Sequence, residues 1–275
     1  MSRIAICAPA TPITREAADR VTALATAEFP GLELDFHEQC FAVEGHFAGP
    51  DSLRLSALLD CANDPGVDAV WFARGGYGSN RIAERAITGM SPAARDKAYL
   101  GFSDCGFVLA GLYKAGIGRP AHGPMAGGIM GPDGTGSVRR ALGWFAGATD
   151  GLEPSLDDRP TVAFNLITLA ALTGTPLMPD LTGHVVIVEE VAEHLYAIDR
   201  LFFHLASQLR GIAGMRLGMI TAVPENDRPF GTEAEDIARH WCTSAGIPYL
   251  GRAQVGHDPA NRIVPFGLAA NAPRA

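Results

Sequence analysis

Short apolar runs alternate with longer amphipathic segments through the first part of the chain, and this alternation constrains the fold more than any other feature. The longer segments repeat apolar residues every three or four positions, as helices do, and glycine or proline separates them from the short runs. Strands that alternate with helices build a parallel sheet with helices on both faces, so an α/β fold is predicted. We expect strands at residues 3–8, 32–36, 67–72 and 98–101, and helices at 14–29, from an N-cap at Asp51 onward, and from Ile82 onward.

Ser103 follows the strand at 98–101 and precedes an apolar helical segment at 107–113. This order predicts a strand, a sharp turn and a helix, which exposes the serine hydroxyl beyond the end of the sheet and aims helix N–H groups at the atom it attacks. Glycine stands two residues before the serine and three after it, so the spacing differs from the usual hydrolase elbow. Because a Gly-x-Ser turn is also common as a purely structural feature, a catalytic role requires partner residues elsewhere. Cys105, the other nucleophilic side chain nearby, is expected to pack at the start of the helix.

The composition is typical of an α/β enzyme of the cytoplasm. The 275 residues are 47% hydrophobic and 19% charged, and no apolar run is long enough to cross a membrane. A net charge of -8 without a basic stripe argues against a nucleic-acid partner. The five cysteines are scattered without a C-x-x-C pair, and the N-terminus lacks the pattern of a signal peptide, which favours a reduced, cytoplasmic protein. No motif indicates a metal or another cofactor.

A polar stretch rich in glycine and proline at residues 147–155 predicts a domain boundary near residue 150. We expect a nucleophile-bearing α/β domain at 1–150 and a smaller α/β domain at 151–275. Within the second domain, apolar patterning predicts helices at 165–172, 196–209 and 233–245, and strands at 184–190, 215–223, 247–253 and 262–267.

A serine nucleophile needs a base to take its proton, and two of the eight histidines are candidates. His257 follows a glycine in a loop between two expected strands, a position from which it can reach across to another domain. His122 lies in a loop that contains glycine and proline and that follows the serine turn in the sequence. The residues alone leave both candidates open.

The base needs an acid to orient it, and Glu189 stands directly after the apolar run at 185–188. An unpaired carboxylate at the end of a buried strand is costly, so a cation or a hydrogen-bond donor is expected beside it. The structural alternative is that Glu189 and Glu190 cap the next turn or pair with Arg200. Both interpretations remain open at this point.

The loop at 74–79 holds three glycines in four positions, which lets backbone N–H groups approach a ligand closely. Its spacing fits neither of the common glycine-rich phosphate-binding motifs, G-x-G-x-x-G and G-x-x-x-x-G-K-[ST]. The other interpretation is a backbone donor for an oxyanion beside the serine turn. Arg74 is then available to pair with a substrate carboxylate.

A series of short motifs runs from the first expected strand to the last. They are FARGGYGSNR at 72–81, GFSD at 101–104, HGPM at 122–125, Asn165-Leu166, GTP at 174–176, VEEV at 188–191 with YAIDR at 196–200, and Gly256-His257 with Asn261. In order and spacing these motifs together resemble the LD-carboxypeptidase family. This family includes the cytoplasmic murein tetrapeptide carboxypeptidases and the related microcin C immunity peptidases.

Carried over to the matching positions, the resemblance implies that Ser103 is the nucleophile, Glu189 the orienting acid and His257 the general base. It places the oxyanion donors at the backbone of Asp104 and of the glycine loop, at Gly76. It also implies a flavodoxin-like or amidotransferase-like amino-terminal domain joined to a smaller α/β domain. The site then lies in the cleft between the two domains, and the protein is a homodimer.

The activity implied by the resemblance is cleavage of murein tetrapeptides by a serine carboxypeptidase. The bond broken joins the L-centre of a diamino acid, such as meso-diaminopimelate, to a terminal D-alanine. One alternative is an immunity-type peptidase that cleaves peptide- or acyl-nucleotide toxins and holds the nucleobase of the toxin with an aromatic side chain. The loop at 224–230 offers only Phe230 for that purpose, which favours the cell-wall peptide. The other alternative is a non-catalytic two-domain ligand binder.

The chain departs from the family pattern at positions next to the implied site. The family often has tyrosine where Phe102 stands, an isoleucine-threonine pair where Cys105-Gly106 stand, and glycine where Phe164 stands. These differences bear on the shape of the pocket, and hence on substrate preference, more than on the chemistry.

Overall fold

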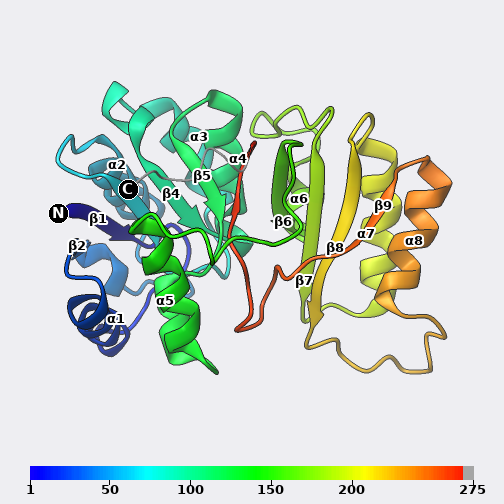
Figure 1. Cartoon of the computed structure of the whole chain (residues 1–275), viewed down its shortest axis with the longest axis horizontal. Coiled ribbons are helices and arrows are strands. Elements are labelled where there is room, and N and C mark those ends of the chain that lie inside the picture. The colour runs from blue at the N-terminus through cyan, green and yellow to red at the C-terminus, as the bar shows by residue number, and fades with distance from the viewer. Residues whose placement is uncertain (269–275) are drawn as a thin grey trace.

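Two sheets lie side by side along the long axis of the molecule in the computed structural model, which describes residues 1–268 (Figure 1). The first sheet has six strands in the order β10-β5-β4-β3-β1-β2, and the second has four in the order β6-β7-β8-β9. All neighbouring strands run parallel except β10, which pairs antiparallel with β5. The order β2-β1-β3-β4-β5 is that of flavodoxin-like folds. The predicted fold, a parallel-sheet amino-terminal part with a smaller α/β part after it, is confirmed.

The first sheet forms because each strand is a short apolar run followed by a helix that packs back onto it. Its elements are β1 (Ser2–Cys7), α1 (Arg15–Glu28), β2 (Leu32–Phe36), α2 (Asp51–Asn63), β3 (Ala69–Phe72), α3 (Asn80–Gly89), β4 (Ala98–Gly101), α4 (Gly106–Ala115), β5 (Arg119–His122), α5 (Gly134–Phe145) and β10 (Val264–Pro265). Short 3-10 turns occur at Glu38–Phe41, Pro92–Asp96, Ser103–Cys105 and Ala126–Met130.

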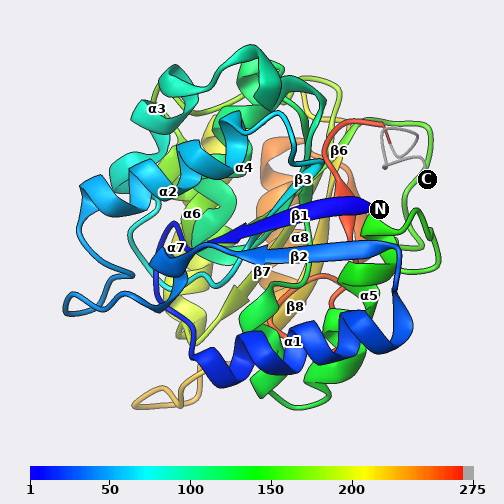
Figure 2. The ribbon, with the colours of Figure 1, turned by 90° about the vertical axis from the view of Figure 1, so that its left-hand side faces the viewer.

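Helices cover both faces of this sheet: α2, α3 and α4 lie on one face, and α1 and α5 on the other (Figure 2). The alternation of side chains along β1 explains why both faces are apolar. Ile4 and Ile6 contribute to the core beneath α1 and α5, whereas Ala5 and Cys7 contribute to the core beneath the other three helices. Strands buried on both faces read as nearly continuous apolar runs, as these do.

The second sheet carries its helices mainly on one side. Its elements are β6 (Thr161–Asn165), α6 (Leu166–Leu172), β7 (Val185–Val191), α7 (Leu195–Gln208), β8 (Gly214–Thr221), α8 (Ala234–Ala245) and β9 (Tyr249–Arg252). The core on the helical side is continuous with the core beneath α2, α3 and α4. Phe164 of β6 and Phe266, which follows β10, meet edge to face at 5.1 Å between ring centroids. The two sheets therefore share buried apolar contacts.

Three local predictions were wrong, and two strands were missed. Helix α2 begins at Asp51 itself, with Pro50 at the N-cap position and no side-chain cap. His122 is the last residue of β5 and does not lie in a loop. The strand expected at 262–267 shrinks to Val264–Pro265, and it joins the first sheet. Strands β5 and β6 were not anticipated at all. The boundary near residue 150 stays a prediction, and β10 carries the chain back to the first sheet after that point.

Candidate active site

Ser103 stands at the carboxyl end of β4, on the predicted turn between strand and helix. All four residues of β4 are buried, Phe102 continues in an extended conformation, and the turn Ser103–Cys105 leads directly into α4. Ser103 itself has a φ of 57°, in the left-handed region that residues other than glycine rarely adopt. Strained backbone of this kind is concentrated at functional sites, where the surrounding fold holds it in place.

A chain of two hydrogen bonds connects Ser103 to side chains of distant segments. Nε2 of His257 lies 3.1 Å from Oγ of Ser103, and Nδ1 of His257 lies 2.7 Å from Oε2 of Glu189. Glu189 lies in β7, where the register against β8 shifts, and its side chain is fully buried. A carboxylate only accepts hydrogen bonds, so Nδ1 of His257 carries the proton in this arrangement. Nε2 is then the acceptor that faces the serine hydroxyl, as a general base requires.

The other histidine candidate, His122, is close by but does not bond to Ser103. It is almost completely buried, and neither ring nitrogen has a hydrogen-bond partner within residues 1–268. Burial, aided by the nearby His257, lowers the pKa of His122 to about 3, so the ring is neutral at physiological pH. Phe102 contacts both imidazoles, with its ring centroid 5.2 Å from that of His122 and 4.8 Å from that of His257. The structure therefore brings His257, and not His122, to the serine.

The glycine loop passes directly over the serine. An ideal Cβ built on Gly75 lies 3.2 Å from Oγ of Ser103, so only glycine leaves the hydroxyl free space here. Oγ1 of Thr11 donates a hydrogen bond of 2.6 Å to the Gly75 carbonyl. In a trans peptide the following N–H points the opposite way, so the N–H of Gly76 faces away from Thr11. Gly76, Ser103 and Asp104 line one pocket of about 300 Å³.

The side chain of Asp104 ties this loop to the serine turn, a role that the sequence did not reveal. Its carboxylate accepts hydrogen bonds from the N–H of Ser79 at 2.8 Å and of Gly78 at 3.3 Å. Oγ of Ser79 donates in return to the Asp104 carbonyl at 2.5 Å. Burial raises the pKa of Asp104, although these donors and the nearby Arg54 act in the opposite direction. The backbone of the proposed oxyanion donor is thus held by side chains on both sides of it.

Arg54 is the second functional-site residue that the sequence did not reveal. Its side chain is fully buried beside the glycine loop, donating to the Gly78 carbonyl at 2.8 Å and the Pro9 carbonyl at 2.5 Å, and it pairs with Asp51. A buried guanidinium needs such partners. No sequence signal marks it, because the partners are mostly backbone carbonyls, which any residue could supply.

Glu190 has a different role from its neighbour. Its carboxylate accepts hydrogen bonds from the N–H of Ile167 in the first turn of α6, from the side chain of Asn165 and from the N–H of Val191. Burial raises the pKa of this carboxyl. The capping interpretation therefore applies to Glu190, while Glu189 is the carboxylate that contacts the imidazole. No ion pair with Arg200 is found for either residue within the described chain.

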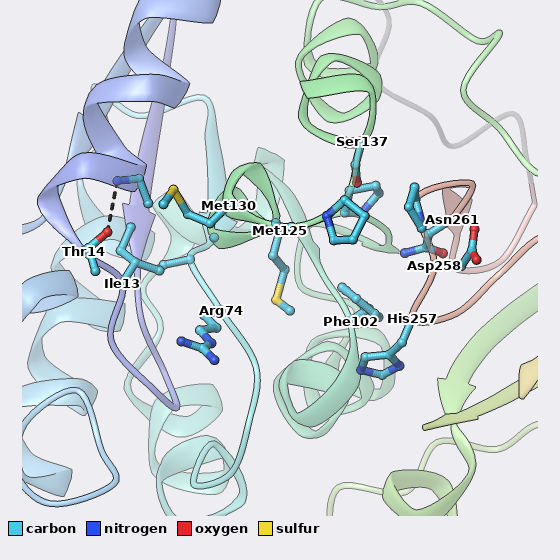
Figure 3. A pocket seen from close by; sticks show the side chains of 18 residues that line it. Ile13, Thr14, Arg74, Phe102, Met125, Met130, Ser137, His257, Asp258 and Asn261 are labelled. Atoms are coloured by element: carbon cyan, nitrogen blue, oxygen red, sulfur yellow. Dashed lines mark hydrogen bonds between the residues drawn. The ribbon is translucent and has the colours of Figure 1, made fainter. Parts of the chain in front are cut away.

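A larger cavity of about 590 Å³ lies on the other side of His257 (Figure 3). Its lining combines the start of α1, the glycine-rich segment near Met125 and the loop that carries His257. Arg74 projects into it, and its guanidinium makes no ion pair with any residue of 1–268 (Figure 3). Its predicted role in binding a carboxylate stays a prediction.

Other chemistries find little support in the side chains that the structure describes. No group of three or more histidine, cysteine or acidic side chains is arranged to hold a metal ion within residues 1–268. Cys105 is buried, and burial raises the pKa of its thiol well above the usual value, which opposes a nucleophilic role. Within the same residues no helix is both long and apolar enough to cross a bilayer.

Comparison with known proteins finds two matching family models. The family model of the LD-carboxypeptidase N-terminal domain matches residues 4–123, and that of the LD-carboxypeptidase C-terminal domain matches residues 160–271. The chain belongs to the LD-carboxypeptidase family. Among relatives of this LD-carboxypeptidase, the murein tetrapeptide carboxypeptidase of Pseudomonas aeruginosa is 25% identical, over 98% of this chain and 92% of that protein.

Solved structures share the fold of this chain. The muramoyltetrapeptide carboxypeptidase from Oxalobacter formigenes has a TM-score of 0.80 at 22% identity, covering 97% of this chain and 93% of its own. The microcin C7 self immunity protein MccF, in complex with aspartyl sulfamoyl adenosine, has a TM-score of 0.74 at 18% identity, covering 97% and 91%. At these identities the likeness concerns the fold alone.

Two of the expected departures of this chain from the family pattern fit each other in space. An ideal Cβ on Gly106 would lie 3.3 Å from the ring of Phe164 and 3.0 Å from the methyl group of Thr168. The phenylalanine therefore occupies the space that a side chain at 106 would need. Phe102, the third departure, packs against the rings of both His122 and His257.

Proposed function

We propose that this LD-carboxypeptidase is a serine peptidase that releases the terminal D-alanine of murein tetrapeptides through an acyl-enzyme on Ser103. The observation that carries the proposal is the hydrogen-bond chain from Ser103 through His257 to Glu189. The family membership and the 25% identical murein tetrapeptide carboxypeptidase of Pseudomonas aeruginosa support the choice of substrate. We further expect a cytoplasmic homodimer, as the resemblance implies, and light scattering of the purified protein tests the dimer.

The proposed first half of the reaction forms the acyl-enzyme. Nε2 of His257 takes the hydroxyl proton while Oγ of Ser103 attacks the carbonyl carbon of the diamino acid. The carbonyl π electrons move to oxygen, and the N–H groups of Gly76 and Asp104 stabilise that oxyanion. As the C–N bond breaks, the imidazolium returns the proton to the nitrogen of D-alanine. Glu189 keeps the ring in one tautomer and stabilises its charge.

The second half hydrolyses the ester. His257 takes a proton from water as its oxygen attacks the acyl carbon, and the proton then passes to Oγ of Ser103 as the C–O bond breaks. The departing amino acid carries a free carboxylate, which a carboxypeptidase must distinguish from a further peptide bond. Arg74 in the larger cavity is the proposed partner of that carboxylate.

The immunity-type peptidase is the second candidate, because MccF shares the fold and its structures contain aspartyl sulfamoyl adenosine or glutamyl sulfamoyl guanosine. Such a substrate calls for an aromatic side chain that stacks on the nucleoside base. In the loop at 224–230 the aromatic residue is Phe230, which is half-buried and packs against the core. This observation favours the peptide substrate. A protein that only binds a ligand does not require a serine, a histidine and a glutamate connected by hydrogen bonds.

Mass-spectrometric assay of tetrapeptides tests the proposal. Wild-type protein should release D-alanine from the LD tetrapeptide and leave matched LL and DD controls intact. Ser103→Ala should fold normally and abolish the release, and retained turnover above about one part in a thousand rejects Ser103 as the nucleophile. Labelling of Ser103 by a fluorophosphonate separates an enzyme from a binder. Loss of activity with EDTA and recovery with zinc would indicate a metallopeptidase instead.

A further inference from the structure

Ser103 lies between two pockets that share no lining residue. The smaller, about 300 Å³, is lined by Ser103 itself and by residues of α6 and of the segment after β7. The larger, about 590 Å³, is lined by His257 and Arg74. The nucleophile thus belongs to one pocket and the base to the other.

The chemistry of acyl transfer assigns a half of the substrate to each pocket. The leaving nitrogen must receive its proton from Nε2 of His257, so the leaving residue occupies the side on which His257 lies. The acyl group remains bonded to Oγ of Ser103 and extends away from the side occupied by the leaving residue. Under the proposed function, the acyl residue therefore projects its side chain into the smaller pocket.

The two pockets differ in the charges of their linings: Arg74 and Asp258, of opposite sign, line the larger pocket, whereas the charged residues that line the smaller pocket are all acidic. The smaller pocket is lined by three acidic residues, Asp104, Glu190 and Glu193, and by no lysine or arginine of the described chain. The carboxylates of Asp104 and Glu190 are already occupied by backbone and side-chain N–H donors. Glu193 is different, because its half-buried carboxylate makes no hydrogen bond or ion pair within residues 1–268.

We propose that Glu193 binds an ammonium group on the side chain of the acyl residue and so selects diamino acids at that position. The inference rests on the proposed function and names what its acyl pocket recognises. Phe107, Ile167 and Ala171 line the same pocket and provide an apolar wall for an aliphatic stem. A carboxylate that is only partly solvated gains more from an ammonium partner than a fully exposed one does. An acidic acyl side chain would meet like charge here.

Peptides that differ only in the charge of the acyl side chain test this proposal. Each ends in D-alanine, preceded by lysine, by Nε-acetyl-lysine or by glutamate, and kcat/KM for D-alanine release is measured for each. Wild-type enzyme should prefer the lysine peptide over its acetylated form by about 10-fold or more. Glu193→Gln should lower kcat/KM for the lysine peptide by about 10- to 100-fold, mainly through KM, and leave the acetyl-lysine peptide within threefold. Glu193→Lys should shift the preference to the glutamate peptide.

A matched control is Glu33→Gln, which removes an exposed carboxylate on β2 at the edge of the first sheet and should change none of these rates. If wild type and Glu193→Gln each release D-alanine equally fast from the lysine and the acetyl-lysine peptide, the role of Glu193 is overturned. The proposed function is unaffected by that result. Absence of D-alanine release from every peptide overturns the proposed function instead. In that case, binding of the intact lysine peptide is compared between the Ser103→Ala variant and the Ser103→Ala/Glu193→Gln double variant. Equal affinities of the two variants overturn the role of Glu193.

Discussion

Gly75 and Ser103 approach each other so closely that an added methyl group on the glycine would lie 3.2 Å from the serine Oγ and 3.1 Å from its Cβ. The same methyl group would meet Cε of Met125 at 3.3 Å. The serine turn and the glycine loop thus fit against each other without spare room, and this fit determines where the hydroxyl stands relative to the loop N–H groups.

Gly75→Ala should therefore impair catalysis more than folding. The serine must move by a few tenths of an ångström to make room, and this displacement is expected to lower kcat by about 10-fold, with the melting temperature changed by only a few degrees. Steady-state kinetics and thermal unfolding of the same preparation measure the two effects. Gly31→Ala is the matched control, because no atom lies within 4 Å of its added methyl group. A Gly75→Ala enzyme with wild-type kcat would show that this contact does not position the nucleophile.

Replacing Glu189 by glutamine should separate geometry from charge. The amide keeps the shape of the side chain but loses the charge that stabilises the imidazolium, and its NH2 group can favour the wrong tautomer of His257. We expect kcat to fall by about 10⁴-fold with little change in the fold. Glu190→Gln is the control. The Glu190 carboxyl contacts the start of α6, so this substitution should leave kcat within tenfold of the wild-type value. Similar losses in the two variants would argue against a special role for Glu189.

The buried His122 should make stability depend on pH. Its pKa is about 3 in the folded protein, against 6.5 for the free side chain, so between these values the unfolded chain binds a proton that the folded chain does not. The contribution of the neutral His122 ring to the free energy of unfolding is therefore fully present above about pH 6.5. It decreases as the pH falls from 6.5 towards 3. The difference in unfolding free energy between wild type and His122→Gln should shrink by about 2 kcal/mol from pH 6.5 to 4.5.

Urea unfolding of both proteins at the two pH values measures this difference. The raised pKa values of Asp104 and Glu190 act in the opposite sense, but they are common to both proteins and cancel. A difference that stays constant with pH would mean that His122 is protonated in the fold.

Gly106 and Phe164 should be energetically coupled, because one leaves the space that the other fills. Gly106→Thr alone should destabilise by about 1–3 kcal/mol through overpacking, and Phe164→Gly alone by about 3–5 kcal/mol through a cavity. The double variant should be more stable than the sum predicts, by about 1–3 kcal/mol. Denaturant unfolding of the four proteins gives this coupling energy. Strict additivity would contradict the complementary fit.

The sequence predicted the parallel sheet and the serine turn because both depend on local patterns, namely apolar runs, helical spacing and turn residues. It missed β5 and β6, since Pro120 interrupts one four-residue strand and the other runs straight into α6. It could not choose between His122 and His257 from the residues alone, because that choice depends on how two sheets are placed. Arg54 stayed hidden for a related reason: its burial comes from backbone carbonyls of other segments.

The segment between β9 and β10 links the outer strand of one sheet to the outer strand of the other, and His257 lies within it. A nascent chain that has not yet reached this segment already contains Ser103 and Glu189 but lacks the imidazole of His257 that connects them. If the proposed triad is right, peptide cleavage begins only after this segment has been synthesised. For the same reason, a partly opened molecule in which the sheets have separated loses its activity before either sheet unfolds.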